Sequence, residues 1–490
     1  MNKLEILEKL DFGNSIAEYD DNISHYYINT PATLDIVNDR YDIIKGTKGS
    51  GKTAMLVAIC SNQQSYSQLQ GKLLIKAIQL KGDPDFQRAF STVTIDTFSQ
   101  QQLIDAWKIY LINVLWHNYG ETFSDSSDLL KYLQQHKILD NKRNALENII
   151  YALKFVKLKA SNTMKSDGSA IQSIEVLASD NITPINSNEK ASLIDFNYIF
   201  SELDILITSK DSCFWVLIDR LDDAFPDNTK NSTLILKSLF YAYKDICFYK
   251  GFKIKIFIRN DIFRIITQNG FTSLTHVSSK TMSTLKWDRA NLEQLIVERL
   301  LFNDEYKKYL DSLNINTNID SMSSSDRIEI INTLIKPQID IGKNNPDSIG
   351  WIINHVKDGK GIFTPRDVIS LLDNARTFQL QYLQKNNLAD VSDNYLLSQN
   401  AIREAYKKIS KEKLVTQIYA EYPKCRAWIE NFINHKSELT NAYLEKILGK
   451  HWKYRSEVLT DIGFLEKKAN SYKIPFIYRV ELNIIQGKEK

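Results

Sequence analysis

The stretch YDIIKGTKGSGKTAMLVAIC (41–60) decides the fold of this chain. It contains a short β-branched run, then a glycine-rich turn, then an apolar stretch, so it predicts a strand, a loop and a helix in that order. Within it, Gly46, Gly51, Lys52 and Thr53 match the pattern G-x-x-x-x-G-K-[ST]. Only 17 of the 490 residues are glycine, so three glycines within six residues are informative.

The spacing of this motif has a chemical reason. Glycines let successive backbone N–H groups converge on phosphate oxygens, and the N-terminus of the following helix adds its dipole. Lys52 is expected to reach the β- and γ-phosphates of ATP, and the Thr53 hydroxyl to bind Mg²⁺. The remaining predicted nucleotide-binding residues are Gly46, Thr47, Lys48, Gly49, Ser50 and Gly51. The alternative is a basic glycine turn without a ligand.

The apolar run in CFWVLIDRLDDAF (213–225) has no polar face, as expected for a central strand of a parallel sheet. A second candidate for a buried strand is FKIKIFIRNDIF (252–263). Strands and helices alternate from about residue 41 to residue 266, which predicts an α/β fold with a doubly wound parallel sheet. Other predicted elements are a strand at 91–98, a helix through Trp107 and Trp116, helices within 124–158, a polar loop at 160–190, and helices at 193–207 and 233–249.

Acidic residues follow the first of these strands. Asp219 directly after the strand is the predicted magnesium ligand, and Asp222 or Asp223 is predicted to polarise the attacking water. A solvated acidic turn is the alternative for Asp222 and Asp223.

The second strand ends in Arg259, Asn260 and Asp261. The carboxyl ends of parallel strands open on one crevice, so Arg259 or Asn260 is expected near the γ-phosphate, where it would detect that group. Asp261 is also predicted to cap the helix that follows.

Further along, Thr364, Pro365 and Arg366 form a helix start, with a hydroxyl before a proline at the first helical position. Arg366 is expected to contact nucleotide phosphates from a lid domain. The alternative is a surface arginine beside Asp367.

Together these motifs resemble the AAA+ and STAND branch of P-loop ATPases, near the origin-recognition initiator clade, and a bacterial P-loop ATPase family often associated with phage defence. The resemblance covers most of the chain except about 120–190. The matching pieces are AEY (17–19), GTKGSGKTA (46–54), VLIDRLDDAF (216–225), FIRNDIF (257–263), LKWDRANLEQLIVERL (285–300), TPRDVISLLDNA (364–375) and IPFIYRVEL (474–482).

The resemblance implies a Walker A motif at 46–53, Walker B acids at Asp219 with Asp222 or Asp223, sensor 1 at Arg259 or Asn260, and sensor 2 at Arg366. It also implies an oligomer or an effector-protein partner. The expected parts are an N-terminal segment (1–40), an ATPase core (41–284) with a variable helical insertion at about 120–190, a helical lid (285–410) and a winged-helix-like end (411–490).

One departure concerns catalysis. Arg220 occupies the position after the magnesium aspartate, where many AAA+ enzymes have glutamate. Hydrolysis is therefore expected to use Asp222 or Asp223, or to be slow, as in a STAND-type switch. Arg289 and Arg299 are candidate intersubunit arginine fingers, and solvated helix-face arginines are the alternative.

The tail mixes lysines and aromatic residues with acids, which leaves DNA contact, protein docking and structural closure open. A balance of 62 basic against 59 acidic residues excludes a strongly basic nucleic-acid coat. Four scattered cysteines and the lack of a long apolar segment or a signal peptide lead us to expect a cytoplasmic protein without a membrane span.

The leading hypothesis is a Mg²⁺-dependent ATPase switch in bacterial defence. The alternatives are a nucleotide-gated DNA-binding module and an ATP-bound scaffold with little turnover.

Overall fold

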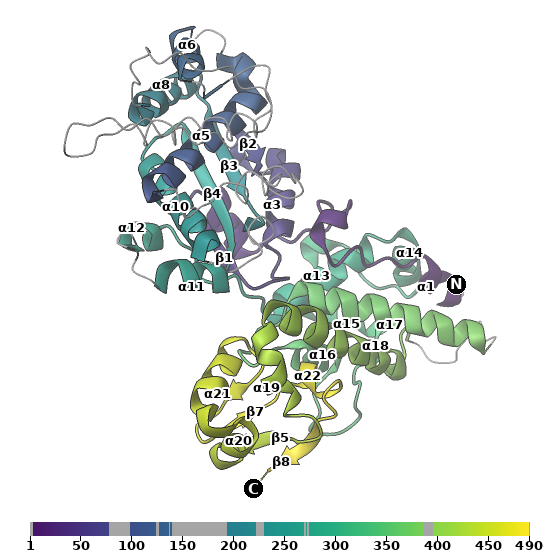
Figure 1. The fold of residues 1–490 in the computed structure, drawn as a ribbon. Coiled ribbons are helices and arrows are strands. Elements are labelled where there is room, and N and C mark those ends of the chain that lie inside the picture. The colour runs from purple at the N-terminus through teal and green to yellow at the C-terminus, as the bar shows by residue number, and fades with distance from the viewer. Residues whose placement is uncertain are drawn as a thin grey trace. The chain divides into compact units, whose positions relative to one another are not determined.

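The computed structural model describes residues 3–77, 99–123, 127–136, 138–139, 194–221, 230–268, 271, 274–386 and 395–489. It divides into two compact units (Figure 1). We call Asp35–Lys45 with Gln63–Thr284 the sheet unit, and Met1–Leu34 with Gly46–Asn62 and Leu285–Lys490 the loop unit. The predicted strand at 91–98, the loop at 160–190 and most of the helices predicted within 124–158 lie outside the described residues. The four-part domain division stays a prediction.

The sheet unit is an α/β structure, as predicted. Its four-stranded parallel sheet has the order β1-β4-β3-β2. The strands are β1 (Ile43–Gly46), β2 (Lys72–Lys76), β3 (Cys213–Ile218) and β4 (Phe252–Arg259). Five of the six β3 residues are buried, which explains the uninterrupted apolar sequence of this strand.

Helices pack against this sheet around one apolar core. The indole Nε1 of Trp107 in α5 donates a hydrogen bond to the Ile235 carbonyl of α10 at 2.9 Å, which joins the two helices. The described helices of the sheet unit are η2 (Gln63–Ser65), η3 (Ser67–Leu69), α5 (Gln100–Tyr119), η6 (Gly120–Phe123), α6 (Ser127–Gln135), α8 (Phe196–Thr208), α10 (Lys230–Ile246), α11 (Asn260–Gln268) and α12 (Leu274–Ser279). Helix α2 (Pro31–Val37) has residues in both units.

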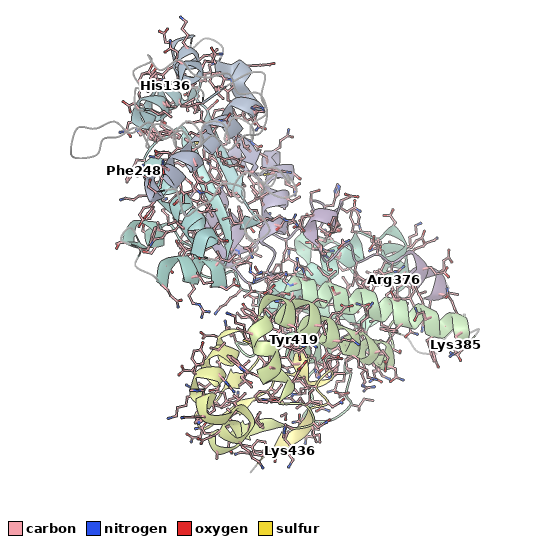
Figure 2. The ribbon with its side chains drawn as sticks, viewed as in Figure 1. His136, Phe248, Arg376, Lys385, Tyr419 and Lys436 are labelled. Carbon is pink, nitrogen blue, oxygen red and sulfur yellow. The ribbon has the colours of Figure 1, made fainter. Side chains whose placement is uncertain are left out.

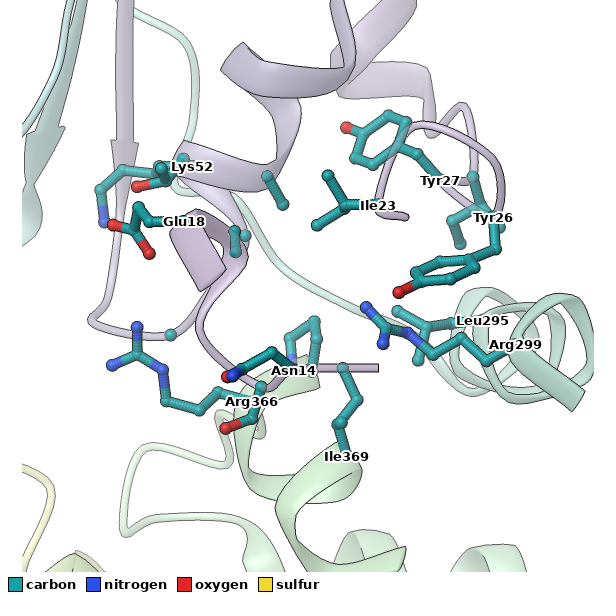
Figure 3. A pocket seen from close by; sticks show the side chains of 18 of the residues that line it. Asn14, Glu18, Ile23, Tyr26, Tyr27, Lys52, Leu295, Arg299, Arg366 and Ile369 are labelled. Carbon is teal, nitrogen blue, oxygen red and sulfur yellow. The ribbon is translucent and has the colours of Figure 1, made fainter. Parts of the chain in front are cut away.

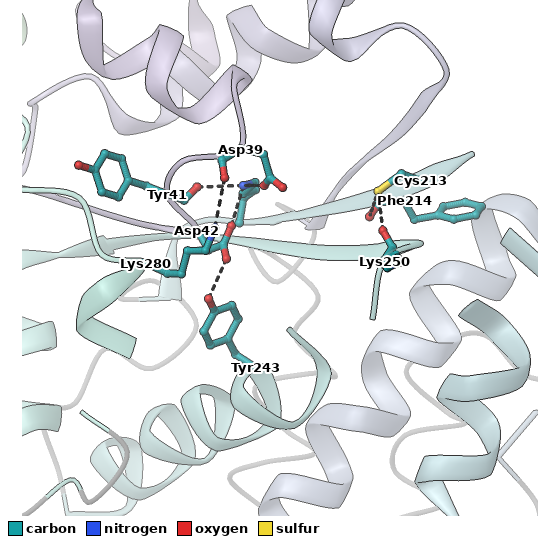
Figure 4. A network of polar contacts seen from close by, with 9 residues as sticks. Asp39, Tyr41, Asp42, Cys213, Phe214, Tyr243, Lys250 and Lys280 are labelled. Carbon is teal, nitrogen blue, oxygen red and sulfur yellow. Dashed lines mark hydrogen bonds and ion pairs between the residues drawn. The ribbon is translucent and has the colours of Figure 1, made fainter. Parts of the chain in front are cut away.

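A buried charge network lies on β4 (Figure 4). Lys255 is fully buried, and its Nζ lies 2.5 Å from the Asp39 carboxylate, 2.7 Å from that of Asp42 and 2.9 Å from the Tyr41 carbonyl. The Tyr243 hydroxyl donates to the second Asp42 oxygen at 2.7 Å. All three donors of the ammonium are therefore used, and the chain entering β1 is attached to the sheet.

The loop unit has its own apolar core, to which the N-terminal helix and the C-terminal segment both contribute. Arg376 of α17 donates to the Leu7 and Glu8 carbonyls at 2.7 and 2.8 Å, which satisfies acceptors at the end of α1 (Figure 2). Its first helices are α1 (Lys3–Lys9), η1 (Ala17–Tyr19), α3 (Lys52–Ser61), α13 (Arg289–Leu301), α14 (Asp304–Ser312), η7 (Ile319–Ser321), α15 (Ser324–Leu334), α16 (Ser348–Val356), α17 (Pro365–Lys385) and α18 (Gln399–Glu412). Residues 285–410 are thus mostly helical, as predicted.

A π-helical segment, η8 (Lys413–Tyr419), continues α18 and leads into a second small sheet of order β6-β7-β5-β8. The predicted helix, turn and two short strands are present as α21, β6 and β7. The elements of this segment are η9 (Pro423–Cys425), α19 (Arg426–Glu430), β5 (Lys436–Thr440), α20 (Asn441–Leu448), η10 (Gly449–His451), α21 (Trp452–Asp461), β6 (Glu466–Lys467), β7 (Ser471–Lys473), α22 (Phe476–Arg479) and β8 (Ile485–Lys488).

Candidate phosphate-binding site

The loop that follows β1 depends on its glycines. A Cβ atom at Gly46 would lie 2.3 Å from the Ser50 Oγ, so a larger residue would require Ser50 to shift. Gly49 and Gly51 have φ angles of +80° and +94°, which residues with a side chain rarely adopt. The glycine spacing that the sequence singled out is therefore a requirement of the loop's conformation.

Lys52 is the first residue of α3, and its side chain folds back along the loop. Its Nζ donates to the carbonyl oxygens of Gly46 at 3.2 Å and Thr47 at 3.0 Å. These two hydrogen bonds hold the positive charge of Lys52 beside the loop.

The N-terminus of α3 is open toward a ligand. Gly51 is its N-cap residue and has no side chain with which to cap the first N–H groups of the helix. The Ser50 Oγ and the Thr47 Oγ1 are both buried without a hydrogen-bond partner, and Ser50 is only 2% exposed. Buried hydroxyls without partners are costly. The uncapped helix, the two hydroxyls and Lys52 therefore fit a phosphate group.

A cavity of about 90 Å³ adjoins this loop and lies within the loop unit (Figure 3). One side of it is formed by Gly49, Gly51, Lys52 and Thr53. The other sides are formed by the N-terminal segment, by α13 and by the first turn of α17. Four parts of the sequence that are far apart thus form one pocket at the predicted phosphate site.

Arg366 lies in this pocket. Thr364 caps α17 through a hydrogen bond from the Asp367 N–H to its Oγ1 at 3.3 Å. A Cβ atom at Gly49 would lie 3.1 Å from the Arg366 Cβ, so the helix start contacts the loop directly. The Arg366 Nε is buried without a hydrogen-bond partner. The Asp367 carboxylate pairs with Lys413 at 2.8 Å. A contact of Arg366 with nucleotide phosphates stays a prediction.

Glu18 is a pocket residue to which the sequence assigned no role. It comes from η1, and it lines the same cavity as Lys52. Figure 3 shows the Glu18 carboxylate and the Lys52 ammonium pointing toward one another. A bound phosphate would therefore have to accommodate or displace a carboxylate, because like charges at short range repel.

Trp287 also contacts the loop. Its indole Nε1 donates to the Ser50 carbonyl oxygen at 2.9 Å, and its ring would lie 3.7 Å from a Cβ atom at Gly51. This hydrogen bond fixes the peptide immediately before the start of α3. The sequence alone did not predict this contact of Trp287.

Buried polar groups form the far end of the pocket. The Arg299 Nη2 lies 3.1 Å from the Asp20 Oδ2, and the Tyr26 hydroxyl donates to the same carboxylate. The Arg299 guanidinium also stacks 4.4 Å from the Tyr26 ring and donates to the Phe12 carbonyl. Burial, together with the hydrogen bond to Asp20, raises the pKa of Tyr26 well above its usual 10. The contacts of Arg299 therefore attach the N-terminal segment to α13.

The two candidate arginine fingers differ in their surroundings. Arg299 is 5% exposed and is held within the chain, so a solvated or intersubunit role is wrong for it. Arg289 lies partly exposed on the helix face, where it pairs with Glu293 at 2.7 Å and with Asp347. An intersubunit role for Arg289 stays a prediction.

The other predicted site residues belong to the sheet unit. Asp219 follows β3 and is 2% exposed. Arg259 at the end of β4 makes a bidentate pair with Asp261, at 3.1 and 2.7 Å. The Asn260 Oδ1 accepts from the Thr284 hydroxyl at 3.2 Å. Because β3 and β4 are parallel, Asp219 and Arg259 lie at the same edge of the sheet.

The prediction that Asp261 caps α11 is wrong by position, because the helix begins at Asn260 and Asp261 lies in its first turn. Burial alone would raise the pKa of the Asp261 carboxyl, but the hydrogen bonds and charge of Arg259 outweigh it and lower the pKa. The roles of Asp219, Arg259 and Asn260 toward a nucleotide stay predictions. Asp222 and Asp223 lie outside the described residues.

The described ranges contain no group of three or more His, Cys, Asp or Glu side chains that could hold a metal ion. The four cysteines are free thiols, and none of the described helices is both long and apolar enough to cross a bilayer. No family model, curated protein or solved structure matches this chain.

Proposed function

We propose that this chain is a P-loop NTPase that binds ATP with Mg²⁺ and acts as a nucleotide-controlled switch. The observation that carries the proposal is the convergence of the uncapped α3 N-terminus, Lys52 and Arg366 on one cavity. Two independent parts of the chain, the loop and the start of α17, therefore supply positive charge to the same place. Such an arrangement suits a ligand with several adjacent phosphates.

In this proposal the loop N–H groups and Lys52 hold the phosphates, and Arg366 binds them from the side of α17. The Thr53 hydroxyl contributes to the magnesium ion that accompanies the nucleotide. Asp219 completes the magnesium shell, and Arg259 or Asn260 detects the γ-phosphate. With Arg220 after Asp219, we expect hydrolysis to be slow, so that the bound nucleotide sets the state of the protein.

The test is Mg²⁺-dependent ATP hydrolysis by the purified chain, with its oligomeric mass measured with and without ATP. The proposal predicts slow turnover that Lys52→Ala abolishes, and a change in mass or shape with ATP. Asp219→Asn should retain ATP but lose turnover. Absence of turnover together with an unchanged mass would count against a switch. A role in bacterial defence with an effector partner belongs to the same proposal and rests on the family resemblance.

A second candidate function is DNA binding by the C-terminal segment, whose β5–α20–α21–β6–β7 order is that of a winged helix. Its α21 presents cations next to aromatic rings, with Arg455 5.2 Å from the Trp428 ring and Tyr454 63% exposed. Such pairs suit phosphate and base contacts. Salt-sensitive retention on duplex DNA that is lost when Lys467 and Lys468 are neutralised would support it, and retention unchanged by both substitutions would oppose it.

A further inference from the structure

The phosphate-binding loop is joined to the C-terminal part of the chain by an ion pair. The Lys48 Nζ, in the middle of the loop, lies 2.9 Å from the Glu421 Oε1. The Glu421 side chain is only 14% exposed, whereas the Lys48 side chain is 40% exposed. Glu421 follows η8 closely, and that segment leads into the C-terminal sheet. Lys48 of the loop is thus paired with an acid from the C-terminal part of the same unit.

A nucleotide would compete for this lysine. A loop of this type surrounds the phosphates, so a lysine within it can reach them with its flexible side chain. At neutral pH a triphosphate carries several negative charges against the single charge of Glu421. Because interaction energy scales with charge and falls with distance, phosphates in the loop would draw Lys48 away from Glu421.

A second connection lies at the other end of η8. Lys413, its first residue, pairs with Asp367 at 2.8 Å, and both side chains are 9% exposed. Asp367 also accepts from the Thr364 hydroxyl at 2.8 Å, next to Arg366. Lys413 at the start of the π-helical segment and Glu421 just beyond its end therefore each pair with a residue next to the pocket lining, Lys413 with Asp367 beside Arg366 and Glu421 with Lys48 beside Gly49. π-Helical segments occur frequently at functional sites.

We propose that Glu421 is a built-in competitor of the nucleotide phosphates for Lys48. Phosphate binding releases Glu421 and loosens the segment around η8, whereas the Lys413–Asp367 pair keeps that segment attached. This inference rests on the proposed nucleotide binding and describes how Glu421 regulates that binding. By linkage, loss of the Glu421 charge must strengthen nucleotide binding by the same free energy with which a nucleotide weakens the ion pair.

The test compares the ATP affinity of wild type, Glu421→Gln and Glu430→Gln by calorimetry in Mg²⁺ buffer. Glu430 is the matched control, because it is an acid of the same segment that pairs with Arg426 instead. We expect Glu421→Gln to bind ATP about fivefold more tightly, and Glu430→Gln to match wild type. Unchanged or weaker binding by Glu421→Gln would overturn the inference.

Hydrogen exchange of wild type supplies a readout that needs no variant. ATP should increase exchange in residues 413–422, and in Glu421→Gln this exchange should already be raised without ATP. Equal exchange with and without ATP in wild type would contradict the release. If wild type binds ATP no better than Lys52→Ala, both the proposed function and this inference fail. If wild type binds ATP and only the Glu421 effects are absent, the inference alone fails.

Discussion

Trp287 is a single side chain that we expect to hold the glycine-rich loop (46–53) in its conformation. Trp287→Phe keeps an aromatic ring but removes the Nε1 donor to the Ser50 carbonyl. We expect it to lower the free energy of unfolding by about 1 kcal/mol and to weaken ATP binding severalfold, because the loop is held less firmly. Denaturation and calorimetry measure the two effects. The control is Trp351→Phe, which loses an indole hydrogen bond to Asp340 of 2.7 Å outside the pocket. Equal ATP affinities of the two variants would contradict a positioning role for Trp287.

His355 is a second residue with a specific effect. It stacks 3.6 Å from the Trp351 ring, and its ring centre lies 4.4 Å from that of Phe476. Burial lowers the pKa of His355 from 6.5 to about 4, although the hydrogen bond between its Nδ1 and the Trp351 carbonyl oxygen, at 2.8 Å, acts in the opposite direction. The folded loop unit therefore holds this imidazole neutral where the unfolded chain would protonate it.

The stabilisation from a neutral His355 is complete above pH 6.5 and is lost as the pH falls toward 4. At pH 4.5 the loss should amount to about 2.5 kcal/mol. Urea unfolding of wild type and His355→Gln at pH 7 and pH 4.5 measures it. Wild type should lose more stability than the variant over this interval, and parallel losses would show that His355 does not titrate in this way.

Several residue-scale features followed from the sequence. The loop after β1 was predictable because its conformation needs glycines at the spacing that the sequence shows. The start of α17 beside Arg366 was predictable because threonine and proline mark a helix start. Glu18 and Glu421 were not, because an acid carries no local signal of what it contacts, and both reach the loop through tertiary packing. Arg299 was misjudged because its burial depends on an N-terminal segment nearly 300 residues away in sequence.

At the scale of elements, β4 depends on its buried lysine. Lys255→Met would leave Asp39 and Asp42 without the ammonium that neutralises them, which typically costs about 3–5 kcal/mol. Chemical denaturation followed by tryptophan fluorescence measures the change, since Lys255 lies 4.3 Å from the Trp215 ring. Lys253→Met on the same strand is the control and should cost far less. Similar losses in the two variants would show that the network does not stabilise the sheet unit.

The start of α17 is the element that presents Arg366. Thr364→Ala removes both the cap to the Asp367 N–H and the hydrogen bond to the Asp367 carboxylate. We expect a loss of about 1 kcal/mol in stability and weaker ATP binding, because the first turn carries Arg366. Thr364→Ser keeps the hydroxyl and should restore both properties. Full ATP affinity in Thr364→Ala would show that the cap does not position Arg366.

Strand β3 was predictable because it is an uninterrupted apolar run whose residues are almost all buried. Strand β4 was also predictable, because β-branched and aromatic residues dominate it although Lys253 and Lys255 interrupt its apolar run. Strand β2 was missed, since KLLIK (72–76) is short and lysines flank its apolar residues. It lies at the edge of the sheet that the described residues form, where it pairs with β3. The start of α11 was placed late, because Asp261 has the composition of a cap while the helix already begins at Asn260.

At the scale of the whole molecule, the loop unit combines three separate stretches of sequence, Met1–Leu34, Gly46–Asn62 and Leu285–Lys490. The phosphate loop therefore shares a compact unit with the helices of 285–410 and with the C-terminal segment. That arrangement lets an event at the loop affect residues 413–422 without passing through the sheet. The 62 basic and 59 acidic residues nearly cancel. We therefore expect electrostatic selection of a ligand to depend on local charged groups and not on the net charge of the chain.

The central claim is that the loop pocket binds a nucleotide through Lys52. Calorimetric titration of wild type and Lys52→Ala with ATP in Mg²⁺ buffer tests it most directly, with circular dichroism to confirm that both chains are folded. We predict one ATP per wild-type chain and at least about a tenfold loss of affinity in Lys52→Ala, because its ammonium interacts with the phosphates. A folded wild type that binds no ATP, or a Lys52→Ala variant with wild-type affinity, would contradict the account.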